Sequence, residues 1–548
     1  MYSKLLRLYH TIRPLRFEQI FYRLWYRFFP LINLTPSLAS YSAKKWAWSG
    51  LEVIKPSFIA RDEVVFLNQQ SFISNRFAWN DASYEKLWLY NLHYFDDLNS
   101  VDSLSRKDIQ YSLVKRWIAE NPPVTGNGWE PYPISLRLIN LIKWYQRAGI
   151  NDQVIIDSIS LQAKALSKQL EYHILGNHLF ANAKALVFVG CFLNDKESDK
   201  YLRLGLKILE REIPEQFLDD GGHFELSPMY HSILLWDLLD LINLAKISGQ
   251  PLLLNNLEGW SAIAVSALRW LDVMTHPDNE ISFFNDATIG IAASPDEIKN
   301  YSLLLGLKTT YANEFYTPLH NTGYSRFRNS KYCLFFDHGA VGPSYLPGHA
   351  HADTLSFEMS IGCDRFFVNS GTSLYGLSNE RHRQRGTEAH STVFVDGADS
   401  SEVWGGFRVA RRASITKCDV DILDDSVSIS AQHDGYLRFN GGVIHNRTIR
   451  ALENMISIED NVSGSFKVAC SVFHLHPDIT IDIISSNELK LTSQSGDIVI
   501  FCTSSPVKIE STSYHPGFGI SVSNKKIVIP LLNGFSKVAI NLEEGLVS

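Results

Sequence analysis

Two histidines stand two residues apart in the stretch GHAHADTLSFE, which spans residues 348–358. The residues that follow them read as a β-strand, and positions i and i+2 of a strand point to the same side. We therefore expect His349 and His351 to share one face. Histidine is a frequent metal ligand and the usual carrier of protons near neutral pH, so the pair suits either a metal site or acid–base catalysis.

Further polar groups follow predicted strands in the same half of the chain. Asn369 ends the strand-like run FFVNSG, and Arg385 and His390 precede the run STVFVDG. Basic residues ahead of a strand usually belong to a solvated loop. A third histidine beside them would nevertheless complete a site together with His351.

The first half of the chain carries two matching groups. The segment EYHILGNHLFANAKAL places Asn177 and His178 after a glycine in an otherwise apolar run. The segment DDGGHFELSPMYH places Glu225 and Tyr230 around a Gly-Gly turn and a Ser-Pro step. Alone, each segment favours a structural explanation: a helix start capped by Asn177, and a loop that enters the next helix.

The elements that must position these groups change in period along the chain. From about residue 81 to 306, apolar residues recur with helical spacing, as in ISLRLINLIKWYQRAG. From about residue 324 onward, short β-branched and aromatic runs end at Gly, Asn or Asp, which indicates strands. The predicted fold is a helical domain (81–315) followed by an antiparallel β-sandwich domain (316–548), after a helical or irregular extension (1–80).

The bulk composition excludes several classes of protein. The 548 residues exceed the size at which one hydrophobic core stops growing, and the formal net charge of −7 argues against a nucleic-acid partner. Six cysteines occur without a CxxC pair, so we expect reduced, buried thiols rather than a zinc ribbon or a disulfide framework. No stretch has the length of an uninterrupted apolar transmembrane span.

The N-terminal stretch MYSKLLRLYHTIRPLRFEQIFYRLWYRFFPLI is basic and aromatic. It lacks the compact apolar region followed by small residues that marks a secretory signal, which favours a cytoplasmic protein. One interpretation of the stretch is peripheral contact with a membrane surface, and the other is an amphipathic helix docked on the protein itself. We favour docking, because Pro14 and Pro30 interrupt any long surface helix.

Five segments, in this order, resemble the heparinase II/III-like family of polysaccharide lyases. They are WEPYPISLRLIN (129–140), GNHLFANAKAL (176–186), DGGHFELSPMYH (220–231), GHAHADTLSFE (348–358) and AHSTVFVDG (389–397). The resemblance covers nearly the whole chain. It implies an incomplete (α/α) toroid followed by an antiparallel β-sandwich, no organic cofactor, and cleavage of an acidic polysaccharide by β-elimination at a uronic acid.

Such an elimination requires three kinds of group. The C5 proton of a uronic acid is weakly acidic beside an ionised carboxylate, so the enzyme must first neutralise that carboxylate. A base then takes the C5 proton and an acid protonates the leaving oxygen, each transfer being worth about 10²–10⁴-fold. By resemblance, Asn177 and His178 contact the carboxylate. Tyr230 is the catalytic acid, and the base as well in syn elimination, and His349 is the candidate base for the opposite sugar epimer.

The resemblance also implies substrate contacts. The candidate substrate-binding residues are Trp129, Tyr132, Arg137, Glu225 and Arg385. A free tyrosine has a pKa of about 10, so a nearby positive charge would help to form the tyrosinate. Arg137 or Arg385 would supply that charge, and Glu225 would orient His178 or contact the sugar.

A structural metal site, usually zinc, is the last implication of the resemblance. Its ligands would be His351, Asn369 and His390, and the family normally has an aspartate where this chain has Asn369. A neutral amide is a poorer ligand than a carboxylate and does not balance the charge of the metal. The sequence therefore leaves open whether the site binds a metal weakly, recruits Asp353 or holds no metal.

Two other functions remain open at this point. A glycoside hydrolase on a toroid would need two carboxylates across a cleft, and its candidates are Glu130, Asp220, Glu225 and Asp286. It would leave the Tyr, His and Asn residues unexplained. A non-catalytic polysaccharide-binding or assembly protein on a lyase fold is favoured only by Asn369.

The cellular setting also has two interpretations. The family resemblance implies the periplasm or cell envelope as the alternative to the cytoplasm, and a link to bacterial surface or exopolysaccharide metabolism. The sequence predicts neither the polymer nor the oligomeric state.

Overall fold

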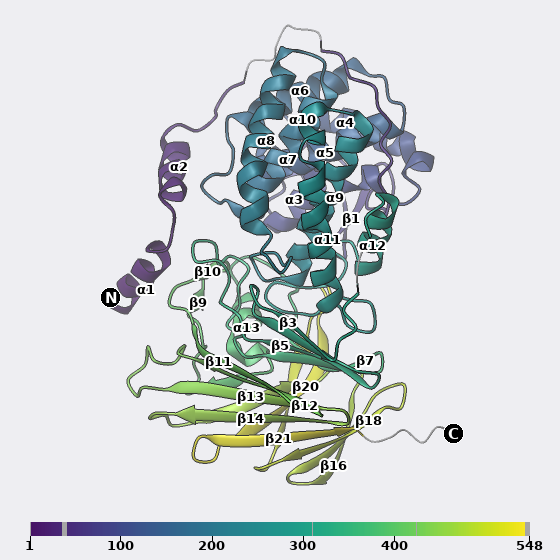
Figure 1. Ribbon diagram of the computed structural model, residues 1–548. Helices are drawn as coiled ribbons and strands as arrows, with labels where there is room; N and C mark the ends of the chain where they lie inside the picture. The colour runs from purple at the N-terminus through teal and green to yellow at the C-terminus, as the bar shows by residue number, and fades with distance from the viewer. Residues whose placement is uncertain (1, 35–40, 309–310, 424, 543–548) are drawn as a thin grey trace.

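The computed structural model describes residues 2–34, 41–308, 311–423 and 425–542. Helices gather in the N-terminal part and strands in the C-terminal part, and Figure 1 shows the helical bundle above the sheets. The three large sheets are antiparallel throughout. This arrangement confirms the predicted fold class, a helical region followed by an antiparallel β region.

Two N-terminal helices, α1 and α2, and a small hairpin precede the helical part, which contains α3 to α12. The helices are α1 (Tyr2–Ile12), α2 (Phe17–Phe28), α3 (Lys86–Tyr94), α4 (Lys107–Glu120), α5 (Pro131–Arg147), α6 (Gln153–Ser167), α7 (Gly176–Phe192), α8 (Lys196–Gln216), α9 (Pro228–Ser248), α10 (Pro251–Leu254), α11 (Leu257–Val273) and α12 (Pro295–Leu304). The hairpin is formed by β1 (Glu63–Phe66) and β2 (Gln69–Phe72). Helix α7 is buried along nearly its whole length and packs between α5 and α8.

The start of α9 is fixed by its own sequence. The Ser227 side chain accepts a hydrogen bond from the backbone N–H of Tyr230, and Pro228 occupies the first helical position, where no N–H donor is needed. The helix ends at Gly249, whose φ of 61° lies in the left-handed region that favours glycine. Tyr230 is thereby held in the first turn of the helix.

Helix α7 begins at a position that favours glycine. Gly176 has a φ of 57°, and a Cβ added there would overlap the side chain of Leu346. The same Cβ would lie 3.2 Å from Oε1 of Glu225. The glycine therefore lets the first turn of α7 approach both Glu225 and the loop that leads to His349.

The C-terminal part consists of three large sheets and one small one. A five-stranded meander contains β3 (Tyr316–Leu319), β4 (Tyr324–Arg328), β5 (Tyr332–Asp337), β6 (Phe357–Ile361) and β7 (Asp364–Phe367). An eight-stranded sheet has the order β11 (Ile415–Ile422), β12 (Ser426–His433), β13 (Ile444–Leu452), β14 (Met455–Ser463), β21 (Phe535–Leu542), β18 (Ile498–Thr503), β17 (Glu488–Thr492) and β16 (Thr480–Ser485).

The third sheet has four strands and the fourth has two. The four-stranded order is β19 (Lys508–Tyr514), β20 (Val522–Pro530), β15 (Ala469–His474) and β8 (Val393–Val395), and the small ribbon pairs β9 (Val403–Trp404) with β10 (Arg408–Val409). Burial alternates along β12 and β13, as expected for strands with one buried face. One apolar core joins the large sheets, with Phe357, Ile458 and Phe473 contributed by different ones.

The cysteines agree with expectation only in part. All six are unpaired, and Cys191 and Cys333 are buried. Cys363 and Cys418 are exposed, so the expectation of buried thiols is wrong for these two. In the part of the chain that the structure describes, no helix is both long and apolar enough to cross a bilayer.

Candidate active site

Two tyrosines and a histidine meet where the helical part adjoins the sheets. The Tyr230 and Tyr375 hydroxyls lie 3.0 Å apart, and the Tyr230 ring stacks on the His349 ring at a centroid distance of 3.8 Å. Tyr230 comes from α9, while the other two come from loops of the C-terminal part. Burial raises the pKa of Tyr230 well above its usual range, and the neighbouring Tyr375 and Asp286 raise it further. Tyr230 is therefore a neutral proton donor in the free protein.

Asp286 orients this group. Its carboxylate accepts hydrogen bonds from Nδ1 of His349 and Nε2 of His351, each at 2.9 Å, and from Nη2 of Arg381 at 2.7 Å. Burial works to raise the pKa of Asp286, but the charge of Arg381 and these hydrogen bonds outweigh it and hold the pKa well below its usual range. Because Nδ1 of His349 donates to the carboxylate, Nε2 is left as the basic atom of the ring.

Glu225 is the nearest carboxylate to that basic atom. Its Oε2 lies 3.7 Å from Nε2 of His349, and its side chain is almost fully buried. Burial raises the pKa of Glu225, while the His349 and His178 imidazoles counteract this. We call Tyr230, Tyr375, His349, Asp286 and Glu225 the tyrosine–histidine cluster.

His178 lies on the other side of Glu225, in the first turn of α7. Its Nδ1 is 2.9 Å from Oε1 of Glu171, and its ring faces the Tyr132 ring at 4.3 Å. Burial lowers the pKa of His178, but the Glu171 carboxylate outweighs burial, so the pKa lies above the ordinary value. The side chain is 25% exposed, and because Nδ1 contacts Glu171, Nε2 is the ring nitrogen left for a ligand.

Asn177 precedes His178 in the same helical turn and is buried. Together with Tyr132 and Tyr230 it belongs to the first turn of a helix: α5, α7 and α9 all begin beside this site. A helix N-terminus carries a partial positive charge. These partial charges favour an anion beside the first turns of the three helices.

The loops beside the site contain unusual backbone conformations. Leu175, Leu226 and Asn285 have φ values of 72°, 59° and 58°, and they adjoin Gly176, Glu225 and Asp286. A non-glycine residue in this region costs of order 1–3 kcal/mol. The Asn285 side chain joins the loop of Leu226 to the loop of His351. Its Nδ2 donates to the Leu226 carbonyl at 2.8 Å, and its Oδ1 accepts from the His351 N–H at 2.9 Å.

Two of the predicted substrate-binding residues are not brought to the tyrosine–histidine cluster. Arg137 is buried and donates to Gln162 and to the His93 and Gly128 carbonyls, with its guanidinium 3.8 Å from the centre of the Trp117 ring. Trp129 is also buried and donates to the Asn121 carbonyl. Both side chains support the wall of the helical part.

Arg385 lies near the cluster, but its guanidinium donates to backbone carbonyls of the protein. Its guanidinium donates to the Ala350 and Gly406 carbonyls at 2.8–3.1 Å. Burial lowers the pKa of Arg385 to about 9. The arginine that faces the tyrosines is Arg381, whose guanidinium carbon lies 4.8 Å from the centre of the Tyr375 ring.

The predicted zinc ligands form an incomplete site. In residues 2–34, 41–308, 311–423 and 425–542, no three His, Cys, Asp or Glu side chains are arranged to hold a metal ion. Nδ1 of His351 lies 3.3 Å from Nε2 of His390, and the Asn369 amide oxygen accepts from the Ser391 N–H at 3.2 Å. The Asp353 carboxylate accepts from the Asn285 N–H at 3.1 Å. Two neutral imidazoles and an amide supply no anionic ligand, so this donor set fits zinc poorly.

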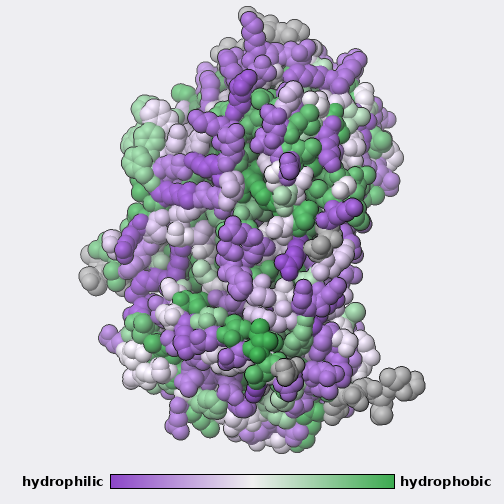
Figure 2. Space-filling model, in the orientation of Figure 1, coloured by the Kyte–Doolittle hydropathy of each residue, from purple (hydrophilic) through white to green (hydrophobic). Residues whose placement is uncertain are grey.

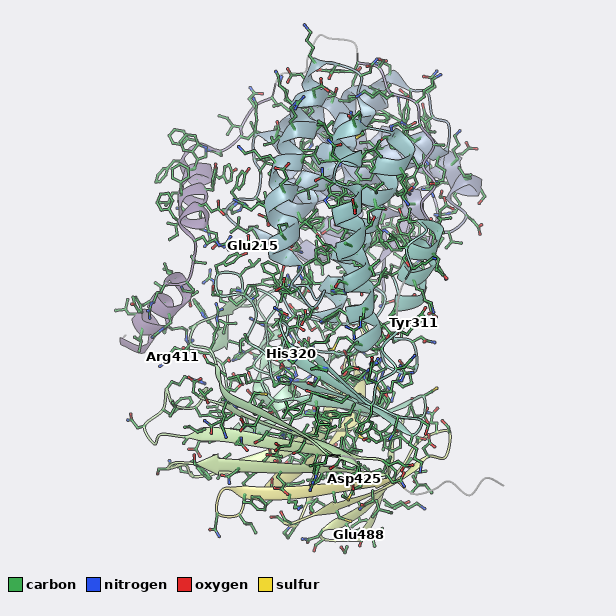
Figure 3. All side chains as sticks on the ribbon, viewed as in Figure 1. Glu215, Tyr311, His320, Arg411, Asp425 and Glu488 are labelled. Atoms are coloured by element: carbon green, nitrogen blue, oxygen red, sulfur yellow. The ribbon has the colours of Figure 1, made fainter. Side chains whose placement is uncertain are left out.

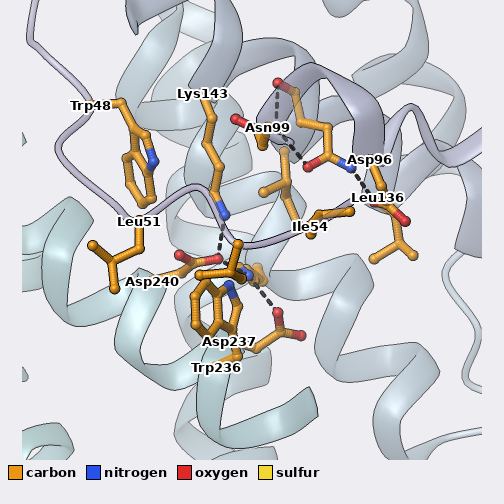
Figure 4. Close-up of a pocket in the computed structure, with 14 residues that line it drawn as sticks. Trp48, Leu51, Ile54, Asp96, Asn99, Leu136, Lys143, Trp236, Asp237 and Asp240 are labelled. Atoms are coloured by element: carbon orange, nitrogen blue, oxygen red, sulfur yellow. Dashed lines mark hydrogen bonds and ion pairs between the residues drawn. The ribbon is translucent and has the colours of Figure 1, made fainter. Parts of the chain in front are cut away.

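A cavity of about 120 Å³ lies deeper among the same helices (Figure 4). Lys143 and Lys184 contact Asp240 there, and Lys184 also contacts Asp237. These charges are paired with one another and lie two or more turns from the helix starts that carry Tyr132, His178 and Tyr230. We interpret this network as structural.

Three members of the site are absent from the residues selected on sequence: Asp286, Arg381 and Tyr375. The sequence offers Asp286 only as a candidate hydrolase carboxylate, and Arg381 belongs to the basic run RHRQR, which is typical of a solvated loop. Tyr375 follows a strand in SGTSLYG and carries no pattern of its own. A buried acid beside several basic groups is a three-dimensional signal, since Asp286 lies 63 residues from His349 and 95 from Arg381.

Comparisons with known proteins agree with this architecture. Residues 40–305 match the family model described as heparinase II/III N-terminus, and residues 314–536 match heparinase II/III-like, C-terminal. The chain is 25% identical over 302 residues to a heparin-sulfate lyase of Bacteroides stercoris, covering 49% of this chain and 43% of that protein. It is 27% identical over 270 residues to a heparin-sulfate lyase of Pedobacter heparinus, covering 44% and 39%. The alignments thus span less than half the length of these relatives.

Solved structures show the same fold. The crystal structure of heparinase III superposes with a TM-score of 0.71 at 17% identity, covering 85% of this chain and 79% of that one. The heparan sulfate lyase of Pedobacter heparinus superposes with a TM-score of 0.56 at 18% identity, covering 88% and 80%. With both family models matched in order across the helical and β parts, the chain belongs to the heparinase II/III-like family.

Proposed function

We propose that this protein is a polysaccharide lyase that cleaves a uronic-acid-containing polymer by β-elimination. The observation that carries the proposal is the stacking of Tyr230 on His349, with Nδ1 of that histidine held by Asp286. This arrangement combines a neutral hydroxyl acid with an imidazole whose second nitrogen is basic. The family membership and the heparin-sulfate lyase relatives support it.

Neutralisation of the substrate carboxylate is the first requirement. His178 supplies a positive charge, because the Glu171 carboxylate raises its pKa. Its Nδ1 contacts Glu171, so its Nε2 points away from Glu171 and is left for the substrate. Asn177 supplies an amide in the same turn, and the N-termini of α5, α7 and α9 add their partial charges. Loss of the C5 proton then forms an anion next to a carboxylate that no longer repels it.

Proton transfer is the second requirement. Nε2 of His349 takes the C5 proton, and the Tyr230 hydroxyl protonates the O4 leaving group as the C4–O bond breaks. After turnover the proton that His349 has taken returns to the Tyr230 oxygen, and the Tyr375 hydroxyl, 3.0 Å from that of Tyr230, can relay it. For a sugar whose C5–H and C4–O lie on one face, Tyr230 serves in both transfers. Because its pKa is raised, the tyrosinate forms only when His349 takes the hydroxyl proton.

A hydrolase is less well supported by the same geometry. It needs two carboxylates free to flank the glycosidic bond. Asp286 is paired with Arg381, Asp220 accepts from the Asn321 and Thr322 N–H groups, and Glu130 pairs with Lys86. Glu225 alone remains near the tyrosines. We therefore assign Glu225 a role in substrate contact and in holding the proton of His349.

The test is a panel of uronic-acid polysaccharides that includes both sugar epimers. A lyase produces an unsaturated sugar that absorbs in the ultraviolet, whereas a hydrolase produces new reducing ends without this absorbance. We expect absorbance to rise with one class of polymer and to fall by about 10²–10⁴-fold in Tyr230→Phe. Exopolysaccharides from bacterial surfaces belong in the panel, because we propose that the polymer is made by the cell that makes this protein.

Tyr436→Phe is a matched control for Tyr230→Phe. Tyr436 is likewise buried, and its hydroxyl donates to the Val393 carbonyl at 2.8 Å, so it is not a member of the tyrosine–histidine cluster. The control should retain wild-type turnover. Reducing ends without ultraviolet absorbance would replace the proposal with hydrolysis. Binding of a polymer without turnover, unchanged in Tyr230→Phe, would replace it with a binding protein.

A further inference from the structure

The two N-terminal helices are oriented against the usual rule for a surface helix. An amphipathic helix normally turns its apolar stripe toward the protein and its polar side toward water. We call residues 2–28, which comprise α1 and α2, the N-terminal arm. In this arm the polar side faces the protein, and the apolar side faces outward.

Helix α2 shows the reversal along its whole length. Gln19 is buried and donates to the Tyr345 carbonyl, Tyr22 stacks on Tyr172, and the Tyr26 hydroxyl donates to the Leu170 carbonyl. The opposite face, at spacings of three and four residues, is apolar and exposed: Phe17, Ile20, Phe21, Leu24, Trp25 and Phe28. Phe17 is 80% exposed and Phe28 is 70% exposed. Figure 2 shows an apolar patch on the left edge of the molecule, where α2 lies in Figure 1.

Helix α1 repeats the pattern. Arg7 pairs with Glu402 at 2.9 Å, and Thr11 accepts from Nε1 of Trp404 at 3.1 Å. The outward face again follows the spacing of a helix and is apolar: Leu5, Leu8, Tyr9 and Ile12. The prediction that the N-terminal stretch docks on the protein is therefore confirmed, but only its polar side is used.

The arm is anchored to both parts of the molecule. Arg16 pairs with Glu215 of α8, while Arg7 pairs with Glu402, the residue that precedes β9. Figure 3 labels Glu215 and Arg411 at the edge of the body nearest the arm, and Arg411 pairs with the same Glu402 at 2.9 Å. The outward apolar face is thus held in place by the fold rather than presented by a free tail.

Charge indicates what covers this face. The arm has six basic side chains and one acidic side chain, whereas the whole chain has a net charge of −7. Lys4, Arg13 and Arg27 are exposed and, among the described residues, have no acidic partner. Aromatic and leucine side chains flanked by arginines suit the boundary between lipid headgroups and acyl chains. A symmetric contact with a second copy would instead place one basic arm against another.

We propose that the N-terminal arm binds the surface of a bilayer that contains anionic lipid, with the outward face of α1 and α2 in the headgroup layer. The protein would lie on the membrane without crossing it. This binding is independent of the proposed lyase activity, because none of the arm residues belongs to the tyrosine–histidine cluster.

The test is co-sedimentation of the full chain with vesicles. Vesicles of phosphatidylcholine alone are compared with vesicles of phosphatidylcholine and phosphatidylglycerol, each at low and high salt. We expect binding to the anionic vesicles only, weakened by salt. The double variant Phe17→Ser/Phe28→Ser should bind about tenfold or more weakly, and Arg13→Gln/Arg27→Gln about fivefold more weakly for each charge removed.

The matched control removes equally exposed apolar side chains elsewhere. Leu377 is 85% exposed and Phe77 is 71% exposed, and both lie outside the arm. Phe77→Ser/Leu377→Ser should bind like the wild type. Absence of vesicle binding, or equal loss in the control, would overturn the proposal. So would a concentration-dependent dimer, detected by light scattering, that disappears in Phe17→Ser/Phe28→Ser, because a second copy would then cover the face.

Discussion

Asp286 offers a sharp test of how the site is organised, since one buried carboxylate holds two histidines and an arginine. In Asp286→Asn the shape is retained and the charge is lost. The amide cannot accept from Arg381, His349 and His351 as the carboxylate does. Arg381 then remains buried without a counter-charge, which costs about 3–5 kcal/mol of folding free energy. His349 also loses the partner that fixes its protonated nitrogen, so we expect turnover to fall by about 10²–10⁴-fold.

Asp460 provides the matched control for this experiment. It is equally buried and accepts from Nε2 of His445 at 2.9 Å and from Nε and Nη2 of Arg447 at 2.8 Å each. Asp460→Asn should therefore lose a similar amount of stability, without any loss of turnover per folded molecule. Thermal melting measures the first quantity. The rate of ultraviolet absorbance on the polymer identified by the panel, taken well below the melting transition, measures the second.

The outcome separates orientation from stability. A large loss of turnover in Asp286→Asn alone supports the assigned role. If Asp286→Asn retains turnover within about threefold of the wild type, His349 does not depend on this carboxylate and the reasoning is refuted. If both variants lose turnover equally, the loss reflects a destabilised fold, and the orientation argument fails as well.

Three further predictions follow from the structure. Asn369→Asp should add an anionic ligand beside His351 and His390 and so bind about one zinc per chain, whereas the wild type should contain much less; equal zinc contents by elemental analysis would contradict the poor fit. Asp240→Asn leaves Lys143 and Lys184 short of a counter-charge and should cost about 3–5 kcal/mol in thermal or denaturant melting at unchanged turnover; an unshifted transition would show that the network is not stabilising. Stability should fall as the pH is lowered from about 6.5 toward 4, because buried neutral histidines bind fewer protons in the folded chain than in the unfolded chain, and a melting temperature that stays flat across this window would contradict it. Burial lowers the pKa to about 3 or 4 for His93, His231, His338, His351 and His474.

The sequence predicts the architecture because the two periods of its apolar residues are physical consequences of helix and strand geometry. The change near residue 315 separates α12 from β3 in the structure. The sequence also indicates Tyr230 and His349, whose neighbours form recognisable local patterns. Arg137 shows the limit of this reasoning: an arginine near a motif reads as a substrate contact, yet its donors are used by Gln162 and two carbonyl groups. Only the three-dimensional packing reveals such partners.

The same reasoning explains why the sequence does not indicate Asp286 as the partner of His349, or Tyr375 as the partner of Tyr230. Their roles depend on contacts with residues far along the chain, and neither has a local pattern. The N-terminal arm is a different case. The sequence shows that the arm is amphipathic. Which side docks depends on contacts with Tyr345, Leu170 and Glu402, and composition does not show these contacts.

The long sequence separations within the tyrosine–histidine cluster have a consequence for folding. Tyr230 meets Tyr375 across 145 residues, and Asp286 meets Arg381 across 95. Helices form from local contacts, whereas such distant contacts form only after large loops close, and domains of a long chain generally fold as separate units. During refolding, circular dichroism should therefore recover before turnover does. A chain with complete secondary structure can therefore still be inactive.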